Sequence, residues 1–260
     1  MNNNYVVSSR CSDGSILKFE CHDALPSTAR LAKEYAKMGY PDRYVVFSEY
    51  KKKTDSDGRY KQDTEQGIYL SCILRPSIFP SQAGLISSLA AVALTTALEE
   101  HTTKSIGIGW VSNIYCDGKL IGKVWLEGKL DNFTSYEYII VNISIATSKE
   151  NFPARLTDLI KKVFEKDNSS VEIIMAKDIL NKFFSLYSNL KNPSKFMDIY
   201  RKKFILRGHK VKYTQNGKKE TCKVLGVDPE DCALILERKN KEVIHVSTPN
   251  SISVPRKIQI

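Results

Sequence analysis

The stretch that most constrains the fold of this chain runs from Ser105 to Asp131, SIGIGWVSNIYCDGKLIGKVWLEGKLD. Apolar residues recur with small ones between them from Ile106 to Cys116, and Asp117-Gly118 separates this run from a second one, Leu120 to Leu126. Asp-Gly is a typical signal for a two-residue hairpin turn, because both residues tolerate positive φ. The pattern therefore predicts strand, tight turn, strand at the centre of the fold.

Lys119 comes just after this turn, and Gly122 lies three residues further on. A cation on a rigid hairpin, beside a glycine that lets a ligand approach the backbone, is an anion-binding arrangement. A solvated hairpin tip explains the same residues, and the spacing alone favours that second interpretation.

Length and composition indicate an ordinary globular protein. The chain has 260 residues, of which 42% are hydrophobic and 26% charged, so we expect one large domain or a large domain with a small one. The first residues carry no basic start or apolar signal core, and the most apolar run, Ala83 to Leu98, is interrupted by Ser87 and Thr95. We expect a soluble, cytoplasmic protein.

The cysteines and histidines do not form a recognisable metal motif. Six cysteines and four histidines are scattered along the chain, with no CxxC spacing and no Cys/His cluster. We therefore expect reduced thiols and no structural metal.

The positive charge is concentrated near the C-terminus. Of the formal net charge of +10, the segment from Lys191 to Ile260 contributes nine, with 16 lysines and arginines against 7 acidic residues. Such a field attracts an acidic protein, a phosphate-bearing ligand or nucleic acid. A solvated basic surface without a partner is an equally good interpretation.

The remaining pattern predicts an α+β fold. Proline, glycine and alternating apolar residues place strands at 5–9, 16–21, 44–48, 68–75 and 136–145, and helices at 26–38, 82–100, 153–166, 171–190 and 194–205. The strand at 136–145 is expected in the middle of a sheet. Between the third and fourth strands, residues 51–63 contain no aliphatic side chain and are expected to form a long, mobile polar loop.

From Arg207 onward, four or five short strands separated by turns indicate a small β-barrel or sandwich. We therefore expect a boundary near residue 206. At the other end of the chain, Ser27 or Thr28 is suited to cap the first helix; capping is the default role, and holding a polar ligand at the helix N-terminus is the functional alternative.

In order and spacing, several segments resemble the biotin protein ligases, in the branch without a DNA-binding N-terminal domain. The matching segments are PSTARLAKEYAKMG, GIYLSCILRP, GLISSLAAVALTTALEE and WVSNIYCDGKLIG, followed by the tail from RGHKVKY to SISV. The resemblance implies a ligase-type catalytic domain over 1–205, with a mixed β-sheet flanked by helices. It also implies an SH3-like β-barrel over 206–260.

The resemblance implies a two-step reaction. Biotin and ATP, with Mg²⁺, would give biotinyl-adenylate, and a lysine of an acidic carboxyl-carrier domain would then attack it. The carried-over residues are Lys119 as the catalytic lysine, Ser27, Thr28, Tyr50, Tyr69, Ser71 and Gly122 for biotin, and Gly58, Arg59, Trp110 and Asn113 for the nucleotide. The basic C-terminal domain would help receive the carrier, and pairing of central strands between subunits would give a homodimer.

Three departures from the family concern the nucleotide. The Gly-Arg-Gly-Arg loop is replaced by KKKTDSDG after Tyr50, so only Gly58-Arg59 remains, and lysine lacks the bidentate fork of arginine. Lys-Trp-Pro-Asn-Asp becomes GWVSN at 109–113, and the Gly-x-Gly-x-Asn strand end becomes VNISI at 141–145. These changes lie in loops and strand ends, so we expect the fold to be retained.

Two interpretations compete on this basis. One is a working biotin ligase with a divergent nucleotide site. The other is a ligase-fold protein that binds biotin, another acyl group or a carrier domain without forming an adenylate. A relative of lipoate or octanoate ligases fits the C-terminal β domain less well, and a nucleic-acid role is supported by charge alone.

Overall fold

The computed structural model describes residues 4–11, 14, 16–54, 60–131, 135–147, 170–248, 251–254 and 258. Its larger sheet has eight strands in the order β1-β2-β3-β4-β8-β7-β6-β5. The strands are β1 (Asn4–Arg10), β2 (Ile16–Leu25), β3 (Tyr44–Thr54), β4 (Tyr60–Leu74), β5 (Ile106–Gly109), β6 (Asn113–Cys116), β7 (Lys119–Asp131) and β8 (Ser135–Ala146). The β2–β3 pair is parallel and every other pair is antiparallel, so the predicted mixed sheet is confirmed.

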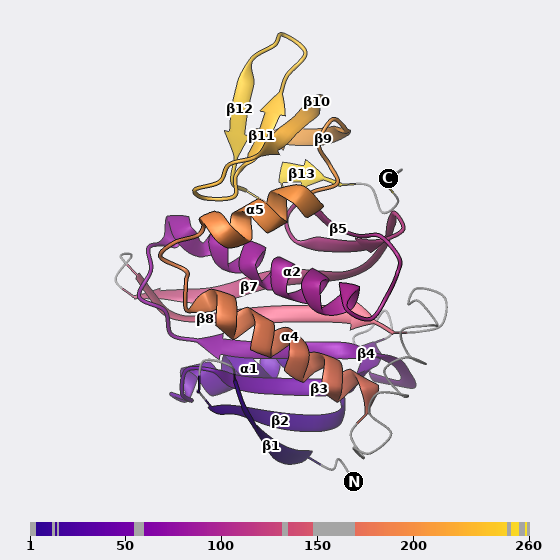
Figure 1. The fold of residues 1–260 in the computed structure, drawn as a ribbon, viewed down its shortest axis with the longest axis vertical. Helices are drawn as coiled ribbons and strands as arrows, with labels where there is room; N and C mark the ends of the chain where they lie inside the picture. The colour runs from indigo at the N-terminus through magenta and orange to yellow at the C-terminus, as the bar shows by residue number, and fades with distance from the viewer. Residues whose placement is uncertain are drawn as a thin grey trace.

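Helices cover both faces of this sheet (Figure 1). One face is covered by α1 (Thr28–Lys37), and the other by α2 (Ala83–Glu99), α4 (Val171–Tyr187) and α5 (Ser194–Lys203), with a short turn η1 (Pro80–Gln82) before α2. The helices predicted at 171–190 and 194–205 are therefore confirmed. The helix predicted at 153–166 lies outside the described residues.

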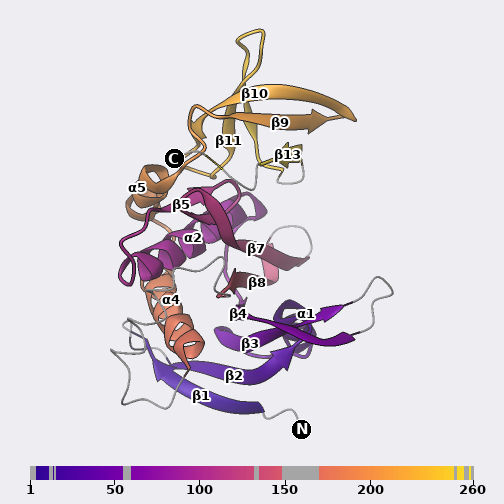
Figure 2. The same cartoon turned by 90° about the vertical axis from the view of Figure 1, so that its right-hand side faces the viewer.

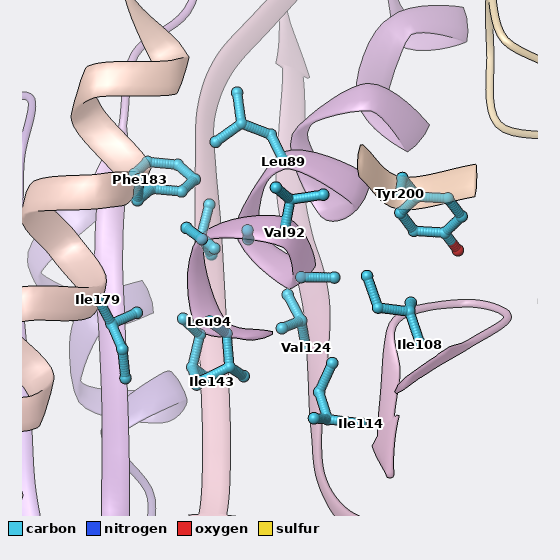
Figure 3. Packing of buried hydrophobic residues seen from close by; sticks show 14 of the residues in the cluster. Leu89, Val92, Leu94, Ile108, Ile114, Val124, Ile143, Ile179, Phe183 and Tyr200 are labelled. Carbon is cyan, nitrogen blue, oxygen red and sulfur yellow. The ribbon is translucent and has the colours of Figure 1, made fainter. Parts of the chain in front are cut away.

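The main core lies between the sheet and α2. Ile143 of β8 lies next to Leu94 of α2 (Figure 3). Val124 of β7, Val92 of α2 and Phe183 of α4 belong to the same cluster. The helix is rich in alanine and other apolar residues, so it packs closely on all sides. Pro80–Glu99 is long and apolar enough to cross a membrane, but 72% of its most apolar 18-residue stretch is buried inside the fold, as in a core helix.

A smaller core lies on the other face, under α1. Ala32 and Ala36 of α1 pack against Val46, Ile73 and Ile140 of three neighbouring strands. Side chains alternate between the two faces of a strand. Residues two or four positions away from Val46, Ile73 or Ile140 on the same strand therefore also face α1. This alternation decides which polar residues line the candidate site.

The central hairpin is confirmed at its turn and differs before it. Asp117 and Gly118 have φ values of 47° and 73°, as the Asp-Gly signal predicts. The single strand expected from Ile106 to Cys116 is wrong, because the chain reverses at 110–112 and forms two antiparallel strands, β5 and β6. Ser112, at φ 60°, lies in this reversal and donates its hydroxyl to Ser87 O at 3.1 Å.

The long polar loop expected at 51–63 is also wrong in part. Strand β3 continues to Thr54 and β4 begins at Tyr60, with Lys51 opposite Glu65 and Lys52 opposite Thr64. Main-chain pairing does not need apolar side chains, so an exposed polar hairpin arm carries no hydrophobic signal. Residues 55–59 lie outside the described part.

The C-terminal strands form a second, five-stranded antiparallel sheet, ordered β12-β11-β10-β9-β13. The strands are β9 (Lys210–Gln215), β10 (Lys218–Val227), β11 (Leu234–Glu237), β12 (Val243–Val246) and β13 (Ile252–Ser253). This sheet lies beyond α5 and β5 in Figure 2 and is compatible with an SH3-like domain. The boundary at residue 206 stays a prediction.

Candidate functional site

Polar side chains cross the α1 face of the large sheet in two neighbouring rows. The first row, which we call the polar row, consists of residues that are register partners on six adjacent strands: His22, Ser48, Tyr69, Ser144, Lys123 and Asn113. The second, inner row contains Glu20, Val46, Ser71, Asn142 and Trp125 in the same way. A row of polar groups on a sheet face that is otherwise apolar under α1 marks this face as the candidate ligand site.

The inner row contains a buried hydrogen-bonded cluster at the start of α1. Ser71 Oγ lies 2.7 Å from Asn142 Oδ1 and 2.9 Å from Thr28 Oγ1. Because a hydroxyl has a single proton, Ser71 donates to the amide oxygen and Thr28 donates to Ser71. All three side chains are buried, so the predicted residues Thr28 and Ser71 do meet, and Asn142 joins them.

Ser27 begins α1 as its N-cap. Its hydroxyl accepts a hydrogen bond from Arg30 N at 3.2 Å, which confirms the capping role expected from the sequence. The side chain is half-buried beside Thr28. A contact between Ser27 and biotin stays a prediction.

The middle of the polar row contains a buried tyrosine. Tyr69 is 6% exposed, and no described residue meets the hydrogen-bond criteria for its hydroxyl. Burial, together with the nearby Glu65 carboxylate, raises the pKa of Tyr69, so the hydroxyl is neutral and able to donate. The Glu65 carboxylate is an acceptor close to this hydroxyl, and an acceptor on a ligand would take its place. Next to Tyr69, Ser48 Oγ donates to Tyr50 O at 2.8 Å, and the predicted Tyr50 is half-buried two residues beyond it.

The two lysines of β7 differ in position. Lys119 is exposed just after the turn and pairs with Cys116, whereas Lys123 pairs with Asn113. A bulge interrupts the β6–β7 register between these two pairs, so the regular alternation that aligns Lys123 with the polar row does not extend to Lys119. The Lys123 ammonium lies over the ring of Trp125, 4.8 Å from its centroid.

Packing against the neighbouring strand explains why residue 122 is a glycine. A Cβ at this position would lie 2.6 Å from Ser144 O on the neighbouring strand β8, closer than any side chain allows. Glycine is therefore required for the β7–β8 contact whether or not a ligand approaches. Its predicted role next to biotin stays a prediction.

The residues assigned to the nucleotide are only partly brought together. Trp110 is 3% exposed, and its indole N–H donates to Cys232 O at 3.0 Å, so its ring packs between the large sheet and the C-terminal strands. Asn113 is half-buried in the polar row beside Lys123. Gly58 and Arg59 lie outside the described residues.

Among the members of the two rows that the sequence did not single out as site residues are Asn142, Ser144 and Lys123. The first two alternate with apolar residues in YIIVNISI of β8, so the period of two was a signal that one face of this central strand is polar. Lys123 carried no comparable signal, because only strand register shows that it faces Asn113 and Ser144.

The inner row ends in a buried carboxylate. Glu20 is 6% exposed and accepts hydrogen bonds from Tyr35 at 2.9 Å and Tyr44 at 2.7 Å, with His22 Nε2 also 2.9 Å away. Burial and then the bond to Glu20 raise the pKa of Tyr35 to about 12. Because three donors already satisfy Glu20, we interpret it as a structural anchor of α1.

A second group of ionisable side chains lies on the helical face. Glu100, His101 and Asp178 place their ligand atoms within 4.8 Å of one another, a set that could hold a metal ion and that the sequence reading did not anticipate. Lys182 already lies 2.9 Å from the Glu100 carboxylate and 2.8 Å from that of Asp178. The group borders a cavity of about 350 Å³ between α2, α4 and α5.

The positive C-terminal sheet has a basic cavity of about 590 Å³ between its two hairpin tips. Lys218 and Lys219 border it from one hairpin, and Arg238 and Lys239 from the other. Arg238 is held by Glu242 at 2.9 Å and by two further partners in this sheet, so the three lysines supply the accessible charge.

Comparison with known proteins identifies the fold. No protein-family model matches the chain. The bifunctional ligase/repressor BirA of Bacillus subtilis is 26% identical over 156 residues, 58% of this chain and 47% of BirA, so the chain spans about half the length of the curated relatives it matches. A structure of biotin protein ligase from Aquifex aeolicus with biotin and ATP covers 90% of this chain and 97% of its own, at a TM-score of 0.66 and 18% identity. The chain is thus similar in sequence to BirA over part of its length and shares the fold of the biotin protein ligases.

The proteins with a similar fold include one without an assigned activity. A biotin protein ligase-like protein of unknown function from Silicibacter sp. TM1040 has a TM-score of 0.63 and 15% identity, covering 90% of this chain and 95% of its own. The Helicobacter pylori biotin acetyl coenzyme A carboxylase synthetase follows at 0.54 and 14%, covering 87% and 98%. The large sheet with its flanking helices thus has the fold of the biotin protein ligase structures.

Proposed function

We propose that this protein attaches biotin to a lysine of a carboxyl-carrier domain through biotinyl-AMP. The biotin carboxylate would attack the α-phosphate of ATP and release pyrophosphate, and the carrier lysine would then attack the acyl carbon and release AMP. The observation that carries the proposal is the buried Thr28–Ser71–Asn142 cluster beside the Tyr69 hydroxyl on the α1 face. These groups offer a neutral, hydrogen-bonding wall of the kind that a polar ring with an apolar tail requires.

The charge requirements of the first step decide which further residues matter. A carboxylate and a triphosphate repel each other, so cations and donors that strengthen with developing charge must lie between them. Lys119 and Lys123 supply cations along β7, and the polar row contains no carboxylate. Mg²⁺ would therefore be held chiefly by the phosphates of the nucleotide, which is the usual arrangement for this ion.

The test is pyrophosphate release with biotin, ATP and Mg²⁺. We expect release above background and a loss of roughly 10- to 150-fold in Lys119→Ala, because a charge-assisted contact in the transition state is worth about 1.5–3 kcal/mol. Lys129→Ala, on the same strand, is the matched control and should retain the rate. Background release at saturating ligands would exclude the ligase.

A second function is favoured by the nucleotide-side residues. The indole N–H of Trp110 is already bonded to Cys232 O. In the same segment, Gly109 stands where the family has a lysine, and Asn113 stands where it has an aspartate. A protein that binds biotin, another acyl group or a carrier domain without adenylating it would keep the α1 face and lose these groups. In that case biotin should raise the melting temperature while ATP leaves it unchanged, and an equal shift with ATP would contradict this function.

An acidic carrier domain is the partner that charge favours. The lysines around the C-terminal cavity, Lys218, Lys219 and Lys239, would attract it and increase its association rate at low salt. Replacing all three with glutamine should weaken carrier binding and flatten its salt dependence. Unchanged carrier binding would mean that these lysines face solvent and do not contact the carrier.

A further inference from the structure

We propose that Lys123, Asn113 and Ser144 form a subsite that holds the phosphate group of an acyl adenylate. This inference rests on the proposed function and deepens it, since it names the residues that would hold the charged part of the ligand. The sequence motifs did not single out Lys123, and they placed the segment 141–145 near the nucleotide without naming Ser144 as a contact.

Strand register brings the three side chains together. Lys123 of β7 lies directly opposite Asn113 on one side and Ser144 on the other. Residues that are direct cross-strand partners face the same side of the sheet, with Cβ atoms about 4.5–5.5 Å apart. One ammonium, one amide and one hydroxyl therefore meet on the α1 face, each from a different strand.

The charge of Lys123 is not neutralised within the described part of the chain. No described residue forms an ion pair with it, whereas Lys129 on the same strand pairs with Glu137 at 2.5 Å and Lys33 of α1 pairs with Glu127 at 3.3 Å. Lys123 is also exposed. A cation flanked by two neutral donors is an arrangement that favours an anion.

The Lys123 ammonium is also positioned in advance. It lies 4.8 Å from the ring centroid of Trp125, and the Trp125 indole N–H is in turn 3.4 Å from Glu127 Oε1. Glu127 is bound by Lys33 of α1, so this series of contacts connects the lysine to the helix above the sheet. Side chains that are held before binding lose less entropy when the ligand arrives.

The subsite lies close to the neutral wall of the candidate site. Ser144 and Asn142 are two residues apart on β8 and face the same side, so their side chains are about 7 Å apart along the strand. A ligand with a polar ring at one end and a phosphate at the other can reach both groups. Phosphate fits better than carboxylate, because its tetrahedral oxygens can accept from donors on three different strands.

Calorimetric binding tests this subsite directly. The probes are an acyl-sulfamate analogue of biotinyl-adenylate, which carries a negative charge where the phosphate would be, and biotinamide, which is neutral. We expect Lys123→Met to weaken the acyl-sulfamate about 10- to 100-fold, the range for a charge-assisted hydrogen bond, and to change biotinamide binding less than twofold. Lys123→Arg should bind the acyl-sulfamate within about threefold of the wild-type affinity. The control Lys129→Met should bind it with the wild-type affinity.

The possible results separate this inference from the proposed function. Wild-type affinity for the acyl-sulfamate in Lys123→Met, or an equal loss in Lys129→Met, would overturn the subsite while leaving the ligase intact. A wild-type protein that binds neither probe would overturn both. Asn113→Asp is the second variant: it keeps the size of the side chain and adds a negative charge, so it should weaken the acyl-sulfamate and spare biotinamide.

Discussion

The indole N–H of Trp110 donates to the main-chain oxygen of Cys232, with 3.0 Å between the two heavy atoms. Trp110 follows β5 of the large sheet, and Cys232 precedes β11 of the C-terminal sheet. Both residues are buried, at 3% and 4% exposure. The bond therefore joins the central hairpin to the C-terminal unit in a place that water does not reach.

Trp110→Phe tests this junction. Phenylalanine keeps most of the packing but leaves Cys232 O without its donor, and we expect the free energy of unfolding to fall by about 1–3 kcal/mol. Urea denaturation measures the change. Trp125→Phe, on the half-buried α1 face, is the control and should cost less than 1 kcal/mol, since its N–H meets Glu127 only at 3.4 Å. Equal losses in the two variants would show that the bond to Cys232 adds nothing.

Ser71→Ala tests the buried cluster under α1. The variant leaves Asn142 Oδ1 without the hydroxyl that lies 2.7 Å away, in a position from which water is excluded. We expect a loss of about 1–3 kcal/mol in the free energy of unfolding, together with weaker biotin binding. Denaturation and calorimetry measure the two effects. Ser88→Ala is the control, because that hydroxyl donates to a main-chain carbonyl of α2 at Gly84, and its loss should cost less.

Local chemistry explains which parts of the fold the sequence predicted. The positive φ of Asp117 and Gly118 and the capping of α1 by Ser27 depend on the residues themselves. The reversal at 110–112 contains neither glycine nor proline. Its hydrogen bonds include those of Ser112 with Ser87 of α2 and Val124 of β7, and that of Trp110 with Cys232. Tertiary contacts of this kind leave no mark in the local sequence, so one strand was expected where two occur.

The candidate site shows the same division. Thr28 and Ser71 were expected near each other only because the chain resembles a family, and their contact is seen once α1 lies against β4. Lys123 and Ser144 became candidates through strand register, which depends on how β7 pairs with β8. Alternation predicts which face a residue takes, but the pairing partner of that face is a long-range property.

Gly122→Ala tests the close approach of β7 to β8. The added methyl group would lie 2.6 Å from Ser144 O, and the main chain of a central strand cannot move away cheaply. We expect the free energy of unfolding to fall by about 1–3 kcal/mol, as measured by urea denaturation. Gly226→Ala in β10 is the matched control: its nearest neighbour would be the flexible Arg207 side chain at 3.6 Å. A tolerated Gly122→Ala would mean that this contact is looser than described.

The shifted pKa of Glu49 predicts how the free energy of unfolding depends on pH. This half-buried carboxylate of β3 accepts a hydrogen bond from Ser170 Oγ at 2.5 Å, next to the start of α4. Burial raises its pKa, the bond from Ser170 lowers it in part, and the nearby Glu172 and Asp23 raise it again. The net pKa in the folded protein is therefore above the ordinary value.

Because the folded state binds this proton more tightly than the unfolded chain does, the contribution of Glu49 to stability is largest below the ordinary glutamate pKa. It is lost as the pH rises through the higher folded-state value. Glu49→Gln removes the charge that burial disfavours, so it should raise the free energy of unfolding more at pH 7 than at pH 4. Denaturation at the two pH values measures this difference, and Glu230→Gln in an exposed turn should show none. A larger gain at pH 4 than at pH 7 would mean that the bond from Ser170 outweighs the burial of the Glu49 carboxylate.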